Sequence, residues 1–236
     1  MEKKAIYEGK AKILYETDNS DELLVYYKDD ATAGNGAKKG TIVDKGIMNN
    51  KMTKFFFDLL AEHGIEHHCL AVPSEREMLV KKLTIIPLEV IIRNVAAGSL
   101  AARLGLAEGT KMKIPVIEFC YKNDDLGDPM VNRYHILAME LATDDELTTI
   151  QNLSLKINDI LTKFLKEKKV DLIDFKLEFG RDKDGKVILA DEISPDNCRF
   201  WDSDTKEKLD KDRFRRDLGG VEDAYKEMLR RLTGQE

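Results

Sequence analysis

Two acidic residues stand in equivalent places on neighbouring apolar segments. The stretch DFKLEFGRDKDGKVILADEISPD, residues 174–196, carries Glu178 before a turn signal and Asp191 after it. If Asp184 and Gly185 form a two-residue hairpin loop, antiparallel pairing places Glu178 directly opposite Asp191. Opposed carboxylates repel each other unless a cation lies between them. Oxygen ligands from one or two carboxylates are what Mg²⁺ takes when it is bound together with a nucleotide, so the spacing predicts a magnesium site.

The hairpin leaves alternatives open. Apolar and polar residues alternate along its first strand, so Lys176 shares the polar face with Glu178 and can hold an anion. A four-residue loop would keep both acids on one face, whereas a three-residue loop would put them on opposite faces. The acids also suit a solvated hairpin that only faces water. The segment SPDN, followed by Arg199, favours a site, because such loops present polar groups at a strand end.

Two further segments carry groups that bind phosphate. In YEGKAKILY, residues 7–15, a glycine marks a bend and Lys10 and Lys12 share one strand face, which suits a hairpin covering phosphates or an ordinary surface strand. In IIRNVAAGSLAARLG, Arg93 ends a strand and Ser99 is placed to cap a short helix, so both can meet one anion. The alternative is a plain turn with Arg93 in a surface ion pair.

The other polar residues point less clearly to chemistry. The loop YKNDDLGDPMVN, residues 121–132, suits substrate contact or a plain surface loop, and it lacks the terminal glutamate of an EF-hand. Three histidines around Gly64 are expected at the surface: His63, His67 and His68. No Ser-His-Asp or Cys-His set is visible. The three cysteines lack a CxxC spacing and predict buried free thiols.

The elements that must position these groups divide at residue 93. Strand-like segments dominate up to this boundary, at 5–17, 22–30, 77–83 and 87–94, the last of which reaches it, and one helix is expected over residues 44–64. Helices mixed with a few strands are expected after it, and Thr143 with Glu146 predicts a capping box at the start of a long helix. Strands over 170–180 and 186–194 follow, and the closing helix is expected to break at Gly219 and Gly220. We expect lobes over residues 1–92 and 93–236.

Composition excludes several classes of protein. The chain has 236 residues, 42% of them hydrophobic and 35% charged, which is typical of a folded protein and not of a disordered one. The net charge of −6 gives no overall attraction to nucleic acid or to an anionic membrane. The N-terminal residues lack the apolar stretch of a secretory signal, and no apolar run approaches ~18 residues. We expect a cytoplasmic protein.

Seven segments together resemble one family: YEGKAK, VKKL, IIRNVAAGSLAARLG, KNDDLGDPMVN, DFKLEFG, DEISPDNCRFW and DKDRFRRDLGG. That family is phosphoribosylaminoimidazole-succinocarboxamide synthase, or SAICAR synthetase, and the resemblance runs nearly end to end. It implies an α+β fold of two lobes, like those of ATP-grasp enzymes and kinases. The N-terminal lobe would be antiparallel and β-rich, the C-terminal lobe larger and α/β, with the ATP cleft between them.

The resemblance also implies an activity. An ATP-dependent ligase of this family joins carboxyaminoimidazole ribonucleotide (CAIR) to L-aspartate through an acyl phosphate, giving SAICAR, ADP and phosphate in de novo purine biosynthesis. ATP and Mg²⁺ are implied as cofactors, and a homodimer as the assembly. Two alternatives stay open. One is a small-molecule kinase that uses the same cleft, and the other is a nucleotide-binding module without turnover.

The resemblance assigns roles to individual residues. Glu178 and Asp191 look like the family's metal-binding and catalytic acids, and Arg93, Ser99 and Arg199 like its clamp for the ribonucleotide phosphate. The nucleotide contacts that it implies are Gly9, Lys10, Ala11, Lys12, Lys81, Ile85, Glu89 and Lys122. It places Lys176, Lys211 and Arg215 among the catalytic residues and Asp196 among the substrate-binding ones, their individual roles open. No residue is identified as the base for the aspartate amine. Where some members have an acid, this chain has Asn35, which leaves a charge-dependent role there in doubt.

Overall fold

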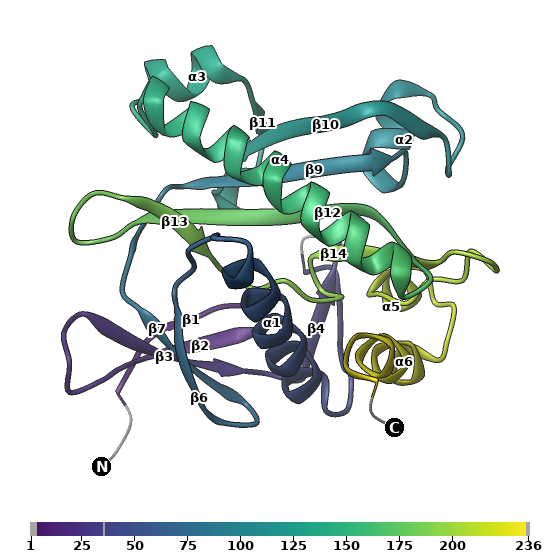
Figure 1. The fold of residues 1–236 in the computed structure, drawn as a ribbon, viewed down its shortest axis with the longest axis horizontal. Coiled ribbons are helices and arrows are strands. Elements are labelled where there is room, and N and C mark those ends of the chain that lie inside the picture. Colours follow the sequence, from purple (N-terminus) through teal and green to yellow (C-terminus); the bar gives the residue numbers. More distant parts are fainter. Residues whose placement is uncertain (1–3, 35, 235–236) are drawn as a thin grey trace.

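The computed structural model describes residues 4–34 and 36–234, and its chain forms two antiparallel sheets and a short hairpin (Figure 1). The first sheet has the strand order β1-β2-β3-β7-β6. Its strands, in chain order, are β1 Ala5–Glu8, β2 Lys12–Glu16, β3 Glu22–Tyr27, β6 Cys69–Ser74 and β7 Glu77–Lys81. The separate hairpin consists of β4 Asp30–Ala33 and β5 Lys38–Thr41. The segments predicted as strands in this part of the chain are confirmed, except that 5–17 forms two strands, β1 and β2, joined by a bend at residues 9–11.

The second sheet is built around one long central strand. Its order is β11-β10-β9-β12-β13, and β8 and β14 also pair with β12. The strands are β8 Thr84–Ile85, β9 Leu88–Val95, β10 Lys111–Tyr121, β11 Met130–Val131, β12 Val170–Arg181, β13 Val187–Ala190 and β14 Cys198–Asp202. The strand predicted over 186–194 is shorter than expected. It ends at Ala190, because Asp191 takes a left-handed backbone conformation with φ of 59° that cannot continue a strand.

Two long helices cover these sheets. Helix α1, Lys45–Glu62, packs on the first sheet, and α4, Asp144–Glu167, crosses the second (Figure 1). The capping box at the start of α4 is confirmed: the hydroxyl of Thr143 accepts from the Glu146 backbone N–H, and the Glu146 carboxylate accepts from the Thr143 backbone N–H. These bonds satisfy N–H groups that a helix start leaves without partners.

Five shorter helical elements complete the described part of the chain, and the last of them packs against α1. They are α2 Gly98–Leu104, the 3-10 helix Asp124–Leu126, α3 Arg133–Ala138, α5 Asp212–Arg215 and α6 Val221–Thr233. The closing helix breaks where the sequence predicts, because Gly219 and Gly220 take positive φ values of 72° and 59°. Within residues 4–34 and 36–234, no helix is both long and apolar enough to cross a membrane.

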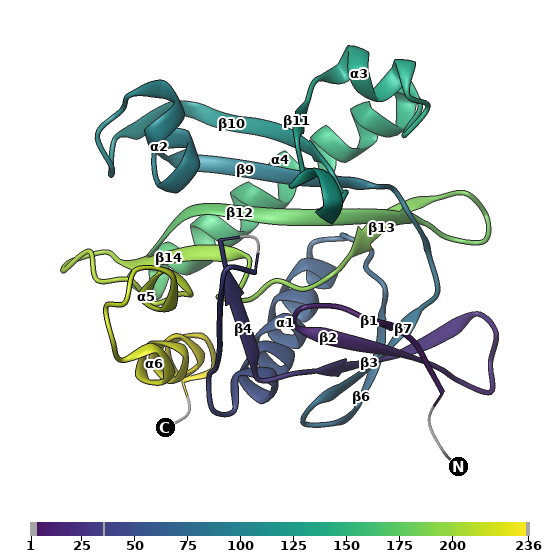
Figure 2. The same cartoon turned by 180° about the vertical axis from the view of Figure 1, so that it is seen from behind.

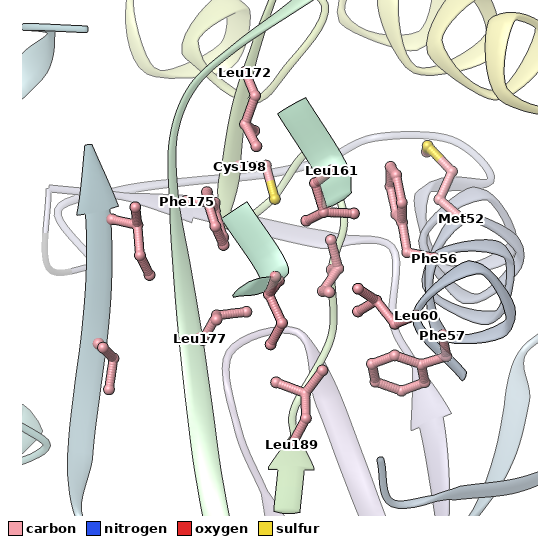
Figure 3. Close-up of a cluster of buried hydrophobic side chains, with 14 of the residues drawn as sticks. Met52, Phe56, Phe57, Leu60, Leu161, Leu172, Phe175, Leu177, Leu189 and Cys198 are labelled. Atoms are coloured by element: carbon pink, nitrogen blue, oxygen red, sulfur yellow. The ribbon is translucent and has the colours of Figure 1, made fainter. Parts of the chain in front are cut away.

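The sheets and helices share a single large hydrophobic core. Figure 3 shows side chains of α1, such as Phe56, pointing toward side chains of α4 and of β12, such as Leu161 and Phe175. The same cluster extends to Val25 and Met78 of the first sheet. The strand β9 continues through the lobe boundary expected at residue 93. Polar side chains of β12, such as Asp174 and Lys176, do not join the core and line a cavity instead. The core therefore fixes both sheets relative to that cavity.

Candidate active site

The β12–β13 hairpin differs from its predicted register by one residue. Glu178 pairs with Ala190, not with Asp191. The backbone N–H of Asp182 bonds to the carbonyl of Lys186 at 3.0 Å, so the loop has three residues, 183–185. Its third residue, Gly185, has φ of 80°. Glycine in the left-handed conformation at the third loop position is typical of three-residue hairpins. The predicted two-residue loop is therefore wrong.

The two acids still lie side by side despite this register. Asp191 is the first residue after β13, and its left-handed conformation breaks the alternation of side chains that a strand imposes. The ammonium group of Lys176 touches both acids, at 2.5 Å from Glu178 Oε1 and 3.1 Å from Asp191 Oδ2. The two acids thus lie on the same side of the sheet because of the backbone conformation of Asp191, which strand periodicity does not predict.

Lysines surround this pair of acids. Lys12 bonds to Asp191, Lys122 bonds to Glu178, and Lys176 also lies 3.3 Å from Glu89. Burial opposes the negative charge of Asp191, but Lys12 and Lys176 hold its pKa well below its usual range. Burial likewise opposes the charge of Lys176, but the acids raise its pKa well above its usual range. Asp191 and Lys176 are therefore both charged at neutral pH.

The donor set fits a hard cation that is shared with a phosphate ligand. In the described part of the chain, no three His, Cys, Asp or Glu side chains gather into a ready metal cage. Glu178 and Asp191 offer carboxylate oxygens from two adjacent positions, and both line a pocket. Because Mg²⁺ keeps several waters and takes one or two carboxylates plus phosphate oxygens, two acids are sufficient for it.

A small apolar pocket adjoins the acids. It has a volume of about 230 Å³ and lies between the first sheet and the β12–β13 hairpin, which face each other in Figure 2. Its apolar walls come from Tyr7, Leu14, Leu23, Val25, Val80, Leu83 and Ile85. Lys12, Lys81 and Lys122 line it as well. An apolar slot with a few charged groups at one side is the usual form of a small-molecule site.

His68 belongs to this pocket, so its predicted place at the surface is wrong. It is buried, and its Nε2 lies 3.2 Å from the carbonyl oxygen of Asp191. Burial lowers the pKa of His68 to about 4, which leaves it neutral. His67 is half-buried and stacks on Phe57, with ring centroids 4.6 Å apart, so it also departs from the prediction. His63 is exposed, as predicted.

A second, more polar cavity of about 510 Å³ lies against the same strand, β12. Arg93 donates from Nη2 to the Ser99 hydroxyl at 3.1 Å. Asp174 lies between two guanidinium groups, accepting from Arg93 Nη1 at 2.9 Å and from Arg199 Nη1 at 2.8 Å. Glu118 and Asp212 accept from the far sides of these arginines. The three residues expected to bind one phosphate are therefore brought together.

Ser99 does not cap helix α2, contrary to the prediction. The helix begins at Gly98 after Ala97, and no side chain caps it. The Ser99 hydroxyl is turned to Arg93 instead. Gly98 has φ of 50°, and a Cβ atom there would lie 2.5 Å from Nη2 of Arg199. Glycine is thus needed at this position both for its backbone conformation and for the close approach of the arginine.

Asp196 lies at the same cavity in a buried network. Its Oδ2 accepts from Lys45 at 2.6 Å, and its Oδ1 accepts from the Tyr225 hydroxyl at 2.7 Å. Lys211 and Arg215 line the cavity beside it. Lys45, Tyr225, Asp174 and Asp212 were not predicted from the sequence to be site residues. The available signal was a lysine, Lys45, at the start of an apolar helix. Its carboxylate partner, Asp196, lies 151 residues further along the chain, so the sequence pattern did not reveal the pair.

The remaining expected residues lie around the two cavities. Lys10 occupies the turn between β1 and β2, not a strand as predicted, and pairs with Asp124 of the 121–132 loop at 2.8 Å. Gly9 forms the bend, its N–H donating to the Lys12 carbonyl at 2.8 Å. Ala11 and Glu89 line the larger cavity, and Lys81 and Ile85 the smaller one. Asn35 lies outside the described residues.

The sequence and the fold of this chain are similar to those of known proteins. The sequence profile of SAICAR synthetase matches residues 5–232. The chain belongs to the SAICAR synthetase family. A phosphoribosylaminoimidazole-succinocarboxamide synthase of Caldanaerobacter subterraneus subsp. tengcongensis is 60% identical over 233 residues, which cover 98% of this chain and 99% of the relative. The fold class implied by the sequence is confirmed by this membership and by the structures below.

Solved SAICAR synthetases have the same fold. The crystal structure of the synthase from Ehrlichia chaffeensis matches with a TM-score of 0.96 and 48% identity, over 99% of this chain and 100% of that one. A SAICAR synthetase in complex with ADP matches with a TM-score of 0.95 and 50% identity, over 98% of each chain. This chain therefore has the fold of the solved SAICAR synthetases.

Proposed function

We propose that this chain joins CAIR to L-aspartate with the hydrolysis of ATP, giving SAICAR, ADP and phosphate in de novo purine biosynthesis. One observation carries the proposal. Lys176 lines the larger, polar cavity and bonds to the two acids that line the smaller, apolar one. A nucleotide in one cavity and an anionic substrate in the other would thus meet at a single cluster of charges.

The smaller cavity is the proposed nucleotide site, and the relative solved with ADP supports nucleotide binding by this fold. The base would lie among apolar side chains such as Leu23 and Val25. The phosphates would extend toward the β1–β2 turn, where Lys10 and Lys12 can neutralise them. Glu178 and Asp191 would hold Mg²⁺, which supplies charge neutralisation at the phosphate oxygens.

The larger cavity is the proposed site of the ribonucleotide and of aspartate. Arg93, Ser99 and Arg199 would hold the ribonucleotide phosphate, because two guanidiniums and a hydroxyl converge there. The free carboxylate of the ribonucleotide would then lie toward Lys176 and take the γ-phosphoryl group, forming an acyl phosphate. The amine of aspartate attacks the acyl carbon and displaces phosphate. Positioning and charge stabilisation are the tasks of the protein in both steps.

We propose that the two expected lobes of the chain have different roles. Residues 1–92 would cover the nucleotide, and residues 93–236 would carry the metal acids and the substrate site. We also propose that the enzyme works in the cytoplasm, since its three cysteines are unpaired thiols, as is usual in a reducing compartment. Enzyme activity in the soluble fraction of lysed cells, and none in the membrane fraction, would agree with this assignment.

The reaction is tested by omitting one substrate at a time. We expect ADP release to require ATP, CAIR and aspartate together, apart from slow hydrolysis of the acyl phosphate when aspartate is absent. A coupled ADP assay measures the rate, and mass spectrometry identifies the product. ADP release at full rate without aspartate would indicate a small-molecule kinase. Tight ATP binding with no ADP formed from all three substrates would indicate a nucleotide-binding module.

We propose further that two copies of the chain form a homodimer through the outer edge of the second sheet. Among the described residues, large apolar side chains are exposed on α2, β10, β11 and α3, near that edge: Leu104, Ile114, Met130 and Tyr134. Exposed apolar residues gathered on one side of a protein commonly mark an interface. Sedimentation equilibrium should give the mass of two chains, and Ile114→Asp should weaken the association. A monomer at micromolar concentration would contradict the proposal.

A further inference from the structure

Lys211 is a buried amine without a close partner. It lies directly before α5, lines the larger cavity and is 9% exposed. Within the described part of the chain its Nζ makes no hydrogen bond, and its one ion pair is to Asp196 Oδ2 at the long distance of 3.8 Å. The other cations of this cavity differ, since Arg93, Lys176 and Arg199 each bond directly to at least one carboxylate.

The nearby acid is already occupied by other groups. Lys45 and the Tyr225 hydroxyl bond to the two oxygens of Asp196 at 2.6 and 2.7 Å. Arg215 donates to the backbone carbonyl of Asp196 at 3.2 Å and to Asp212 at 2.7 Å. Because Lys45 neutralises Asp196, a protonated Lys211 would add a surplus positive charge at this wall of the cavity.

This environment disfavours the protonated form of Lys211. Burial lowers its pKa, and the positive charges of Lys45 on α1 and Arg215 on α5 lower it further. Asp196 and Glu192, from the segment after β13, oppose the change, but the net shift is downward. A lysine shifted in this direction has a larger neutral fraction near neutral pH and can accept a proton.

We propose that Lys211 is the base that accepts the proton of the aspartate amine, an assignment that rests on the proposed function. The neutral amine of aspartate attacks the acyl carbon, and the new C–N bond forms as the C–O bond to phosphate breaks. Phosphate leaves with the electron pair of that bond. The proton lost by the nitrogen moves to Nζ of Lys211 and afterwards to water, so the amide product is neutral.

The other titratable groups near the cavities suit this task less well. Lys12 and Lys176 are held protonated by Asp191, which raises the pKa of each. Asp174 accepts hydrogen bonds from two arginines. His68 is neutral, but it lies in the smaller pocket and already contacts the Asp191 carbonyl, and its lowered pKa makes it a weak base. Glu192 also lines the larger cavity and its buried Oε2 makes no hydrogen bond, but it faces the Lys12 ammonium at 3.9 Å, whose charge favours the carboxylate over its protonated form. Among the described cations that line this cavity, Lys211 is the one whose side-chain nitrogen makes no hydrogen bond.

Two variants separate a base from a binding residue. Lys211→Met removes the amine, and Lys211→Arg keeps the positive charge but cannot give up its proton at ordinary pH. For a base, the turnover number with aspartate should fall roughly 10²- to 10⁴-fold in both variants. The exposed Lys206, which pairs with Asp171, provides the matched control Lys206→Met, and this variant should keep the wild-type rate. Circular dichroism and ADP affinity verify that each variant is folded.

Hydroxylamine provides a second readout. This nucleophile is largely unprotonated at neutral pH and loses its proton readily after attack, so it needs a base less than aspartate does. With ATP and CAIR, hydroxylamine should trap the acyl phosphate as a hydroxamate at close to the wild-type rate in both Lys211 variants. The acid-side fall of the wild-type rate with aspartate should also change in Lys211→Arg, because the group that must be neutral has been replaced.

Three outcomes would overturn the assignment. Recovery of aspartate turnover in Lys211→Arg would make Lys211 a binding site for a substrate carboxylate. An unchanged rate in Lys211→Met would place the base elsewhere. Equal losses with hydroxylamine and with aspartate would assign Lys211 to formation of the acyl phosphate. Failure of the proposed function is distinguishable from all three, because the wild-type chain would then show no aspartate-dependent product.

Discussion

Replacing Glu178 with Gln or Asp191 with Asn is expected to lower the turnover number roughly 10²- to 10³-fold while the chain stays folded. Both acids would hold the metal that neutralises the phosphate oxygens, and an amide lacks the negative charge for this. Asparagine tolerates the left-handed backbone conformation of Asp191, with φ of 59°, so the hairpin should keep its shape. The rate of ADP release at a series of Mg²⁺ concentrations measures the effect.

The same hairpin supplies the control for these variants. Asp184 is an exposed acid in the loop between β12 and β13, and Asp184→Asn should leave the rate and its Mg²⁺ dependence unchanged. In the two site variants, the Mg²⁺ concentration needed for half of the maximal rate should rise. Near-normal turnover of both site variants at limiting Mg²⁺ would remove the metal role of the two acids.

Asp174→Asn should be the most destabilising conservative change at the larger cavity. Asp174 is 3% exposed, and both its neighbours are guanidinium groups. Removing one partner of a buried ion pair commonly costs 3–5 kcal/mol. We expect about 3 kcal/mol, the lower end of that range, since Glu118 and Asp212 still bind the far sides of the arginines. Denaturant unfolding measures the loss.

This change should also separate substrate binding from catalysis. Asp174 holds Arg93 and Arg199 toward one another, so its loss should raise KM for the ribonucleotide with a smaller change in the turnover number. Asp171→Asn is the matched control, because Asp171 lies on the same strand and pairs with Lys206 nearer the surface. It should lose less than about 1 kcal/mol and keep KM. Equal effects of the two substitutions would show that Asp174 has no special place.

Local patterns predicted much of the fold. Helices α1 and α4 were predicted because apolar residues recur at helical spacing and Thr143 and Glu146 form a capping box, and both features depend on residues close in the chain. The alternation along β12 was equally visible, as was the break at Gly219 and Gly220. Glu178, Asp191, Lys10, Lys12 and Arg93 could be chosen as candidates by type and spacing, whereas Lys81, Lys211 and Arg215 were implied only by the family resemblance. Each prediction from local patterns needs only neighbours within a few residues.

Other features were decided by backbone conformations and tertiary contacts that the sequence patterns did not show. The hairpin register depended on a glycine at the third loop position, and the meeting of Glu178 with Asp191 depended on a left-handed residue after the strand. His68 was expected at the surface, but Phe57 packs against its ring and its Nε2 contacts the carbonyl oxygen of Asp191, directly after β13. Ser99 turned to an arginine instead of capping a helix.

The sequence by itself determined which elements form and which chemical groups this protein carries, since periodicity, capping and turn residues act over a few positions. Only the tertiary structure decided which charge neighbours which. Asp196 takes its lysine from α1 and its tyrosine from α6, and Asp174 gathers two arginines from separate strands. Burial makes each unmatched charge costly, so the packed chain selects partners that no local pattern reveals. The free amine of Lys211 is a result of that selection.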